Sequence, residues 1–307
     1  MEGLVLMQVI RLRSPGPEGL VAERMETPRP EAGEALVRVH AAAITRNELD
    51  WPVDRLPAIP SYELSGVVVA VAPDVRSVAI GEPVYALTPF DRDGAAADYI
   101  AVPADMLAPK PATIDHVASA AIPLAALSAW QGLFDQGRLE ESERVLIHGA
   151  AGGVGHLATQ LARFRGAHVI GTASEGSLDD ARAFGAHEVF DSRTGHFEHA
   201  VPSVDLVFDT VGGELLRRST AILRRGGRLV SVAEDPPQTP PEAEIDASYF
   251  VVEPSREQLV EIAGLVDRGI LRPVIDSVFP LSEARAAFTR SLSAGKRGKV
   301  VLRVADD

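Results

Sequence analysis

The alternation of apolar and polar positions divides the chain into two parts that meet near residue 116. In the first part, short apolar runs alternate with Gly and Pro, which is typical of strands and tight turns. In the run 36–40 the polar residues Arg38 and His40 fall at every second position, which predicts a strand with one face toward water. This part is expected to form a compact β-rich domain, with strands at 4–10, 35–44, 66–72, 83–87 and 98–102.

After residue 116 the rhythm becomes strand, helix, strand. Apolar residues at helical spacing predict a helix that ends at Gly166, and another over 259–266. Alternating strands and helices indicate a parallel sheet covered on both faces. From Val274 the chain returns to strand-like runs, which we expect to complete the first domain. The strands expected in this second part are 144–148, 169–172, 204–209 and 228–233.

Composition excludes several classes of function. The 43 acidic residues outnumber the 30 basic ones, and a formal net charge of −13 disfavours nucleic acids and anionic membranes. Cysteine is absent, so disulfides and thiolate metal sites are excluded. The apolar start of the chain resembles a first strand more than a secretory signal, and no uninterrupted apolar run is as long as a membrane span. We therefore expect a cytoplasmic protein.

One predicted strand, 144–148, runs through Gly149 into a glycine-rich turn and then into a helix. The turn has the spacing A-x-G-x-x-G, a dinucleotide fingerprint with alanine in its first position. Glycine is required because a pyrophosphate must approach the backbone closely, where a Cβ would collide. The helix N-terminus adds N–H groups and partial positive charge. The predicted contacts to the dinucleotide are Ala150, Gly152, Gly153, Val154 and Gly155.

The next strand decides which dinucleotide is expected. It ends at Ala173 and Ser174, about 20 residues beyond the glycines, where an NAD site usually carries Asp or Glu for the ribose 2′-OH. Ala173 cannot do this, whereas Ser174 can donate to a 2′-phosphate, and Arg193 is a candidate cation on the following segment. These residues favour NADP over NAD. Glu175 argues the other way, since it would repel a phosphate if it pointed inward, and Ser174 is also an ordinary turn residue.

Several segments in a fixed order carry a resemblance to a known family. The chain resembles the medium-chain dehydrogenase/reductase superfamily, in particular its zinc-independent quinone oxidoreductase-like branch of NADP-dependent oxidoreductases. The resemblance covers nearly the whole chain. It rests on GEALVRVHAAAIT (33–45), PSYELSGVVVAVAPDV (60–75), GEPVYAL (81–87), AAIPLAALSAWQGLF (120–134), IHGAAGGVG (147–155), FDTVGG (208–213), GGRLVSVA (226–233) and RGKVVLRV (297–304).

The resemblance implies an α/β fold: a doubly wound Rossmann sheet plus a GroES-like β-rich domain, with the active site in the cleft between them. The GroES-like domain would comprise residues 1–116 and 275–307, and the Rossmann domain residues 117–274. Members of the family commonly form dimers by pairing Rossmann sheets edge to edge. A homodimer is therefore expected, with 245–252 as the edge strand.

The resemblance also bears on zinc. Zinc-dependent members carry Gly-His-Glu, whose histidine binds the catalytic metal, together with cysteine ligands. The matching segment here is Ser61-Tyr62-Glu63, so tyrosine stands in place of that histidine, and cysteine is absent throughout. We therefore expect neither catalytic nor structural zinc.

Three residues are candidates for catalysis. Tyr62 is the best-placed donor, because its phenol could bind or protonate a substrate carbonyl oxygen. Thr45 and Asn47 lie on the loop where the family places its first zinc ligand or an asparagine substitute, and the alignment there leaves both open. Each of the three has an ordinary structural alternative, as a packed tyrosine or a loop hydrogen-bonder.

Further residues match family positions that contact the cofactor. Ser128 matches a threonine at the nicotinamide end and keeps its hydroxyl. Thr210, Val211, Phe250 and Val252 match positions lining the nicotinamide. Lys299 matches the family's terminal Gly-Lys and is expected near the cleft.

These features predict an enzyme that reduces a quinone or an α,β-unsaturated carbonyl by hydride transfer from C4 of NADPH, without a metal. An enolate or hydroquinone oxygen that gains charge needs one or two hydrogen-bond donors and then a proton, which side chains can supply. Two alternatives stay open: a ketone or alcohol oxidoreductase on the same scaffold, and a nucleotide-binding family member without enzymatic activity. The expected partner is a small-molecule substrate.

Overall fold

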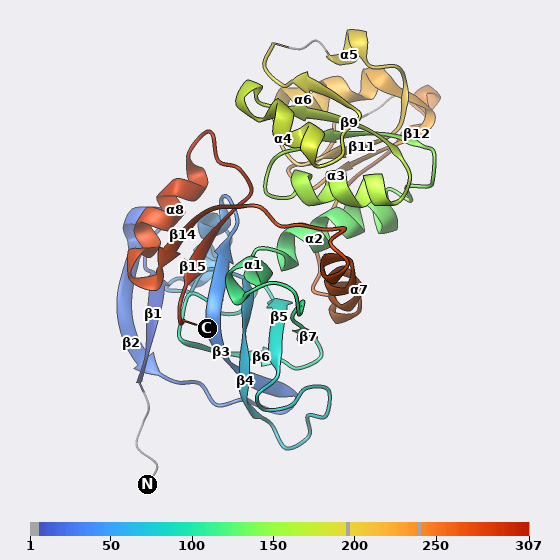
Figure 1. Ribbon diagram of the computed structural model, residues 1–307. Helices are drawn as coiled ribbons and strands as arrows, with labels where there is room; N and C mark the ends of the chain where they lie inside the picture. The colour runs from blue at the N-terminus through green and yellow to red at the C-terminus, as the bar shows by residue number, and fades with distance from the viewer. Residues whose placement is uncertain (1–5, 195–196, 239–240, 307) are drawn as a thin grey trace. The chain divides into compact units, whose positions relative to one another are not determined.

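The computed structural model describes residues 6–194, 197–238 and 241–306, and it contains two compact units (Figure 1). Unit 1 comprises Met1–Leu124, Pro254–Gly269 and Pro273–Asp307, and unit 2 comprises Ala125–Glu253 and Ile270–Arg272. The chain therefore leaves unit 1, builds unit 2 and returns, as the strand-like C-terminal runs indicated.

Unit 1 is built on a seven-stranded sheet in the order β14-β15-β3-β4-β5-β7, with β6 pairing β3. A separate two-stranded antiparallel sheet joins β1 to β2. The C-terminal strand β15 pairs antiparallel with β3, so the last residues of the chain complete this unit (Figure 1). Its strands are β1 (Leu6–Leu12), β2 (Leu20–Glu26), β3 (Glu34–Ile44), β4 (Glu63–Val71), β5 (Pro83–Leu87), β6 (Tyr99–Pro103), β7 (Ala108–Pro109), β14 (Ile275–Pro280) and β15 (Lys299–Arg303).

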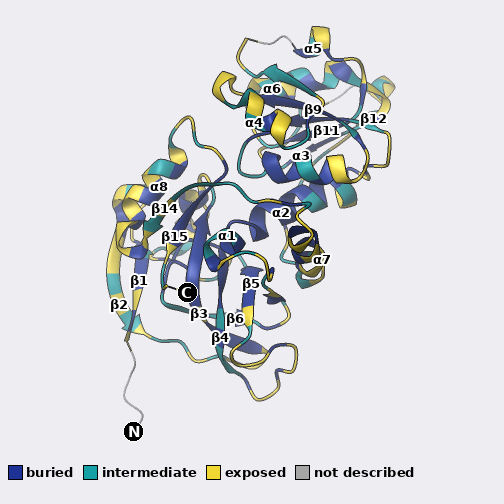
Figure 2. Cartoon of the chain, in the orientation of Figure 1, coloured by how far each residue is buried: buried dark blue, intermediate teal, exposed yellow. Residues whose placement is uncertain are grey.

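The long strand β3 is buried over most of its length (Figure 2). The expectation of one wet face holds for Arg38, which is exposed, and is wrong for His40, which is only 8% exposed. Helix α1 (His116–Ala120) covers His40, and the His116 ring stacks on the His40 ring with centroids 4.4 Å apart. His40 is therefore buried under a helix, and the alternation of residues along the strand cannot predict that a helix covers this position.

Helix α7 (Arg256–Asp267) belongs to unit 1 through polar contacts at both of its ends. The Tyr85 hydroxyl donates to the Leu259 carbonyl, and the Asp267 carboxylate accepts from the backbone and hydroxyl of Thr113. The limits of the units thus differ from 116 and 274, the positions at which the sequence pattern changes. The last helix of unit 1, α8 (Ala284–Leu292), packs against β14 and β15.

Unit 2 is built on a six-stranded sheet in which every recorded pair is parallel, in the order β10-β9-β8-β11-β12-β13. This is the order of a doubly wound Rossmann sheet, which confirms the expected fold class. The strands are β8 (Arg144–His148), β9 (His168–Ala173), β10 (Glu188–Asp191), β11 (Val204–Asp209), β12 (Leu223–Ser231) and β13 (Asp246–Tyr249). The helices are α2 (Pro123–Trp130), which begins at the end of unit 1, α3 (Gly155–Phe164), α4 (Leu178–Ala183), α5 (Phe197–Ala200) and α6 (Gly213–Arg218).

The strand order has a consequence for ligand binding. Strands β8, β9 and β10 extend the sheet in one direction, and the chain then returns to place β11 on the other side of β8. The switch point of the sheet therefore lies between β8 and β11. In open α/β sheets, ligands bind beyond the carboxyl ends of the strands at this switch point. Within the described residues, no helix is both long and apolar enough to cross a membrane.

Candidate active site

The glycine-rich turn follows β8 at the switch point of unit 2, where the sequence predicted the pyrophosphate. A Cβ on Gly155 would lie 1.9 Å from the Gly149 carbonyl oxygen, so only glycine allows α3 to start against the turn. Gly149 has a positive φ of 70°, which also favours glycine. Gly152 and Gly153 are half-exposed, so their backbone is open to a ligand at the N-terminal end of α3. The turn therefore fits a pyrophosphate.

The alanine in the first fingerprint position has a partner on the neighbouring strand. Ala150 is fully buried, and a Cβ placed on Gly171 of β9 would lie only 2.7 Å from its methyl carbon. Family members usually have glycine at the first fingerprint position, where it leaves space next to the neighbouring strand. Here Ala150 occupies that position, and the space for its methyl group comes from Gly171 on β9. The sequence pattern named Ala150 but gave no sign of this pairing.

A second turn, after β11, packs directly on the first. The Thr210 hydroxyl donates to the His148 carbonyl oxygen at 2.7 Å, and a Cβ on Gly149 would lie 2.8 Å from Thr210 Oγ1 and 2.9 Å from Val211 Cγ2. Val211 is 52% exposed despite its apolar side chain. The first βαβ half of such a fold takes one mononucleotide and the second half the other, so this turn belongs to the nicotinamide half. The structure thus packs Thr210 and Val211 against the phosphate turn, and their contact with the nicotinamide stays a prediction.

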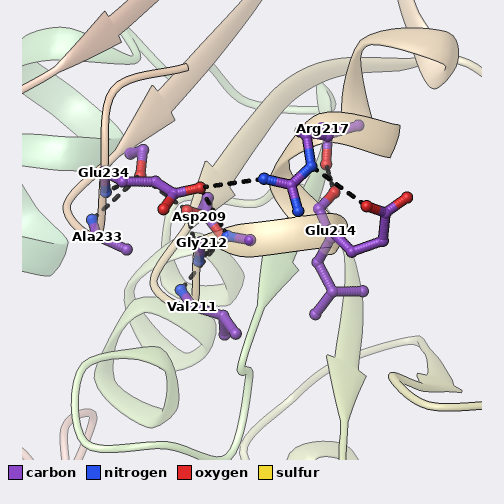
Figure 3. A network of polar contacts seen from close by, with 11 residues as sticks. Asp209, Val211, Gly212, Glu214, Arg217, Ala233 and Glu234 are labelled. Atoms are coloured by element: carbon purple, nitrogen blue, oxygen red, sulfur yellow. Dashed lines mark hydrogen bonds and ion pairs between the residues drawn. The ribbon is translucent and has the colours of Figure 1, made fainter. Parts of the chain in front are cut away.

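The turn after β11 is held by Asp209, a fully buried carboxylate (Figure 3). It accepts hydrogen bonds from the Val211 N–H at 3.2 Å, from the Gly212 N–H at 3.0 and 3.1 Å, and from the Ser231 hydroxyl at 2.7 Å. All of these partners donate, so the carboxyl oxygens of Asp209 act only as acceptors. Within the described part of the chain, no salt bridge to Asp209 is recorded. Its side chain is therefore held by hydrogen-bond donors of the turn and of β12.

The outer side of the same turn carries an exposed carboxylate (Figure 3). Glu234, which follows β12, accepts from the Gly213 N–H at 2.7 Å and lies 4.0 Å from the Arg217 guanidinium. Arg217 also donates to Glu214 at 3.2 Å on the same helix. These solvent-exposed contacts contribute little, whereas the buried Asp209 contacts determine the shape of the turn.

His148, the last residue of β8, lies in a buried polar network behind the two turns. The Ser219 hydroxyl donates to the Leu215 carbonyl at 2.7 Å, so it accepts from His148 Nε2, also at 2.7 Å. The Thr172 hydroxyl, 2.9 Å from Nδ1, then donates to the ring. Burial lowers the His148 pKa to about 3, and the positive charge of Arg218 lowers it further in the same direction. The ring is therefore neutral and has one fixed tautomer.

The ribose end of the predicted site lies at the ends of β9 and β10. Ser174, Glu175 and Arg193 are all exposed there. Asp191, which the sequence did not single out, pairs in register with Ala173, and the Thr194 hydroxyl and the Arg193 N–H lower its pKa. Two acidic residues and one arginine therefore lie near the position that distinguishes the two dinucleotides.

Three other predicted cofactor contacts occupy different parts of unit 2. Ser128 lies on α2 and is 3% exposed. Phe250 and Val252 follow β13, where the Phe250 N–H donates to the Ser231 carbonyl at 3.2 Å. Ser231 thus contacts both Asp209 through its hydroxyl and this segment through its carbonyl. The contacts of Ser128 and Val252 with a cofactor remain predictions.

Unit 1 contains a buried polar cluster that brings together Thr45 and Lys299. The Lys299 side chain is 4% exposed, donates to Thr45 Oγ1 at 2.9 Å and forms an ion pair with Glu63. The Thr45 hydroxyl can donate to Glu63 Oε1 at 3.3 Å, a long contact, and the other oxygen of Glu63 accepts from the Leu124 N–H at 3.0 Å. The cluster forms because β3, β4 and β15 are neighbours in one sheet.

A second buried carboxyl lies beside this cluster. Glu48 is 1% exposed and accepts from the Thr45 N–H at 2.8 Å and from the Ser61 N–H at 3.1 Å. Burial raises its pKa to about 8, and the nearby charge of Glu63 acts in the same direction, whereas Lys299 lowers it. The sequence analysis did not find Glu48 or the partners of Glu63, because nothing local marks a carboxylate as buried.

The other two catalytic candidates have different surroundings. Tyr62 is fully buried beside Trp51 and Phe90, and its hydroxyl accepts from Arg55 Nη2 at 2.9 Å. Burial raises the Tyr62 pKa to about 12, so the phenol stays protonated. Asn47 is exposed in a left-handed conformation. Thr45 is therefore the candidate that contacts an ammonium group, while Tyr62 is held by a guanidinium.

Comparison with known proteins shows which family has this arrangement. Residues 31–112 match the family model described as Alcohol dehydrogenase GroES-like domain, and residues 184–302 match Zinc-binding dehydrogenase. The chain is 33% identical to "Probable zinc-binding oxidoreductase, mitochondrial" of Arthroderma benhamiae, over 93% of each protein. It belongs to the medium-chain dehydrogenase/reductase superfamily, in the quinone oxidoreductase-like branch.

Two further members of the superfamily have informative names. The chain is 30% identical to "NADPH-dependent alkenal/one oxidoreductase, chloroplastic" of Arabidopsis thaliana, over 90% of this chain and 73% of that protein. The solved structure of the quinone oxidoreductase from Coxiella burnetii superimposes with a TM-score of 0.90 at 30% identity, covering 98% of this chain and 100% of that one. The chain described here is thus an oxidoreductase that uses a nicotinamide cofactor, and its unit 2 has the turns that such a cofactor needs.

Proposed function

We propose that the protein is a zinc-independent, NADPH-dependent reductase of a quinone or an α,β-unsaturated carbonyl. Unit 2 would bind the dinucleotide, and unit 1 would supply the groups that act on the substrate oxygen. The single observation that carries the proposal is the Lys299–Thr45–Glu63 cluster, because it offers a hydroxyl donor backed by a buried cation. The names of the Arabidopsis and Coxiella relatives support the choice of substrate class.

The residues at the positions of the family's metal ligands support zinc independence. The chain has no cysteine, and Tyr62 stands where zinc-dependent members carry a histidine. Thr45, on the loop of the first ligand, donates to or accepts from groups within unit 1 instead. The cation that polarises a substrate carbonyl would then be an ammonium group acting through a hydroxyl.

Four residues at the ribose end bear on the choice between NADPH and NADH. Ser174 and Arg193 offer a hydroxyl and a guanidinium to a 2′-phosphate, whereas Glu175 and Asp191 would repel it. We propose NADPH because Ala173 offers no acceptor to a ribose 2′-OH at the end of β9. Asp191 is held by Thr194 and by the Arg193 backbone rather than being free for the ribose.

Assembly and location are also proposals. Strand β13 (Asp246–Tyr249) ends the sheet order of unit 2 and leaves one edge without a strand within the described residues. A homodimer that pairs two such edges would satisfy the open backbone groups. We propose a homodimer located in the cytoplasm.

The experiment that tests the function uses purified, metal-stripped protein and follows NADPH and NADH oxidation against a quinone, an enone, an enal and a saturated ketone in the presence of EDTA. Turnover of the quinone or the activated alkenes, faster with NADPH than with NADH, is the expected result. Turnover of the ketone alone would instead support an alcohol or ketone oxidoreductase. Binding of NADPH without turnover of any substrate would support a family member that binds nucleotide without catalysis.

A further inference from the structure

We propose that Lys299 supplies the proton of the second half of the reaction, and that it passes this proton to the substrate oxygen through the hydroxyl of Thr45. In this assignment Thr45 is the catalytic donor and Lys299 is a positioning and proton-supplying residue behind it. The inference rests on the proposed function and identifies its proton donor.

The geometry provides a continuous path over two hydrogen-bonding groups. Lys299 Nζ lies 2.9 Å from Thr45 Oγ1 and donates to it. The only hydroxyl hydrogen of Thr45 is then left with the carboxylate of Glu63, at a donor–acceptor distance of 3.3 Å, as its recorded partner. A hydrogen bond of that length is weak, so the hydroxyl can turn toward a substrate oxygen at little cost. Thr45 is partly exposed, whereas Lys299 is only 3% exposed, so a ligand can approach Thr45 but not the buried amine.

Acid strengths explain why both groups are needed. A threonine hydroxyl is too weak an acid to leave an alkoxide behind, so it can donate only if it receives a proton at the same time. The pKa of a lysine ammonium in water is about 10.4 and that of a phenol about 10, so an ammonium and a hydroquinone oxygen are closely matched. Proton transfer is efficient between matched groups. Lys299 behind Thr45 meets this requirement, and the buried phenol of Tyr62, hydrogen-bonded to Arg55, does not have such a supply.

Acidic side chains surround the amine of Lys299. Glu63 forms an ion pair with Lys299, and the carboxyl of Glu48 lies near both. The neighbouring Lys296 has a pKa lowered to about 8, by burial first and then by the charge of Lys299, with Arg46 adding a smaller effect in the same direction. Glu63 contacts the Lys299 amine directly, whereas the Lys296 amine donates to the Gly298 carbonyl at 2.9 Å.

Hydride and proton transfer together balance the reaction. NADPH bound to unit 2 would supply a hydride, with its two electrons, from C4 to the substrate, so that NADPH would be oxidised and the substrate reduced. The substrate oxygen that gains negative charge takes the hydrogen of Thr45 Oγ1 as an O–H bond forms. Thr45 Oγ1 takes a proton from Lys299 Nζ, which becomes a neutral amine and later regains a proton from solvent. The product leaves as a hydroquinone, or as an enol that converts to the saturated carbonyl in water.

The test compares kcat, KM and the NADPH dissociation constant, measured by nucleotide fluorescence, across matched variants. Thr45→Val keeps the shape and removes the hydroxyl, and it should lower kcat about 10²–10³-fold with little change in KM or in NADPH affinity. Thr45→Ser should retain turnover within about tenfold, because the hydroxyl remains. Lys299→Met should lower kcat to a similar extent, and in the Thr45→Val background it should have almost no further effect, since both residues serve one relay.

Two further variants keep the test decisive if Lys299→Met fails to fold because Glu63 is left unpaired. Lys299→Met combined with Glu63→Gln removes the pair together and should show the same loss of kcat in a folded protein that binds NADPH normally. Lys296→Met, a neighbouring lysine without contact to Thr45, should change kcat less than about threefold. Independent, multiplying losses for Thr45→Val and Lys299→Met would overturn the relay, as would full turnover of the paired variant. If the unaltered protein reduces no quinone or activated alkene, the proposed function fails and the inference falls with it.

Discussion

Gly171 on β9 lies opposite the methyl group of Ala150, and this pair gives the sharpest prediction about the phosphate turn. A Cβ added at residue 171 would lie 2.7 Å from the Ala150 methyl carbon, whereas ordinary contacts are about 3.4–4 Å. Neither atom can move away by rotating a side chain, because both are Cβ atoms fixed to the backbone. Strands β8 and β9 are paired in register, with Ile147 opposite Gly171, so the strands themselves would have to shift.

The size of the effect follows from this overlap. Overpacking a buried site by one methyl costs about 1–3 kcal/mol, so Gly171→Ala should lower the free energy of unfolding of unit 2 by that amount and weaken NADPH binding. Ala150→Gly alone should cost about 1 kcal/mol, through the lost methyl contacts and the added backbone freedom. In the Ala150→Gly background the added methyl at residue 171 has room, so the two changes should show a favourable coupling of about 1–3 kcal/mol.

Urea denaturation measures this coupling directly. The chain has two tryptophans, and Trp130 is the one in unit 2, so a Trp51→Phe background makes the fluorescence report on unit 2 alone. The double variant should be more stable than Gly171→Ala. Strictly additive losses would refute the reasoning, because they would mean that the two positions do not compete for the same space.

Four other changes test separate parts of the site. Between pH 6.5 and about 3, the unfolded state binds a proton that His148 in the folded state does not. The free energy of unfolding should therefore fall as pH falls, by about 1.4 kcal/mol per pH unit. A series of acid denaturation measurements should show that His148→Asn lacks this component. Asp209→Asn should weaken NADPH binding about tenfold by fluorescence titration, because an amide cannot accept from all the donors of the turn, while exposed Glu234→Gln should stay within about twofold. Glu175→Arg should tighten NADPH relative to NADH; an unchanged ratio would mean that this side chain faces solvent away from the 2′-phosphate. Tyr62→Phe should leave kcat and NADPH affinity within about threefold, because the phenol is fully buried and hydrogen-bonded to Arg55; a large loss of kcat in a stable protein would place Tyr62 in the mechanism.

Elements with a strong local pattern were predictable from the sequence. Strands β5, β8 and β11 begin and end where the alternation indicated, and the fingerprint glycines lie at the start of α3. The parallel order of unit 2 followed from the repeated strand–helix rhythm. These features depend on neighbours in the chain, which is why the pattern reveals them.

Features that depend on distant residues were not predictable. Asp209 was part of a recognised segment, but its role depends on Ser231, which lies on the next strand of the sheet. Nothing in the sequence singled out Glu48, which is buried beside Lys299 and Glu63. Lys299 was expected at the cofactor and proves to be hydrogen-bonded to Thr45, because β15 returns to pair with β3 after unit 2 is complete. Each of these contacts is determined by the sheet pairing, which local periodicity does not encode.

Transfer of a labelled hydride tests the central claim most directly. Metal-stripped protein, with its zinc content measured on the same sample, is mixed with an enone and with NADPH that carries deuterium in place of both hydrogens at C4. The proposed function predicts a saturated ketone with one deuterium on the β-carbon, formed at a rate that does not depend on residual or added zinc. A product without deuterium, or a rate that rises in proportion to zinc content, would contradict zinc-free hydride transfer.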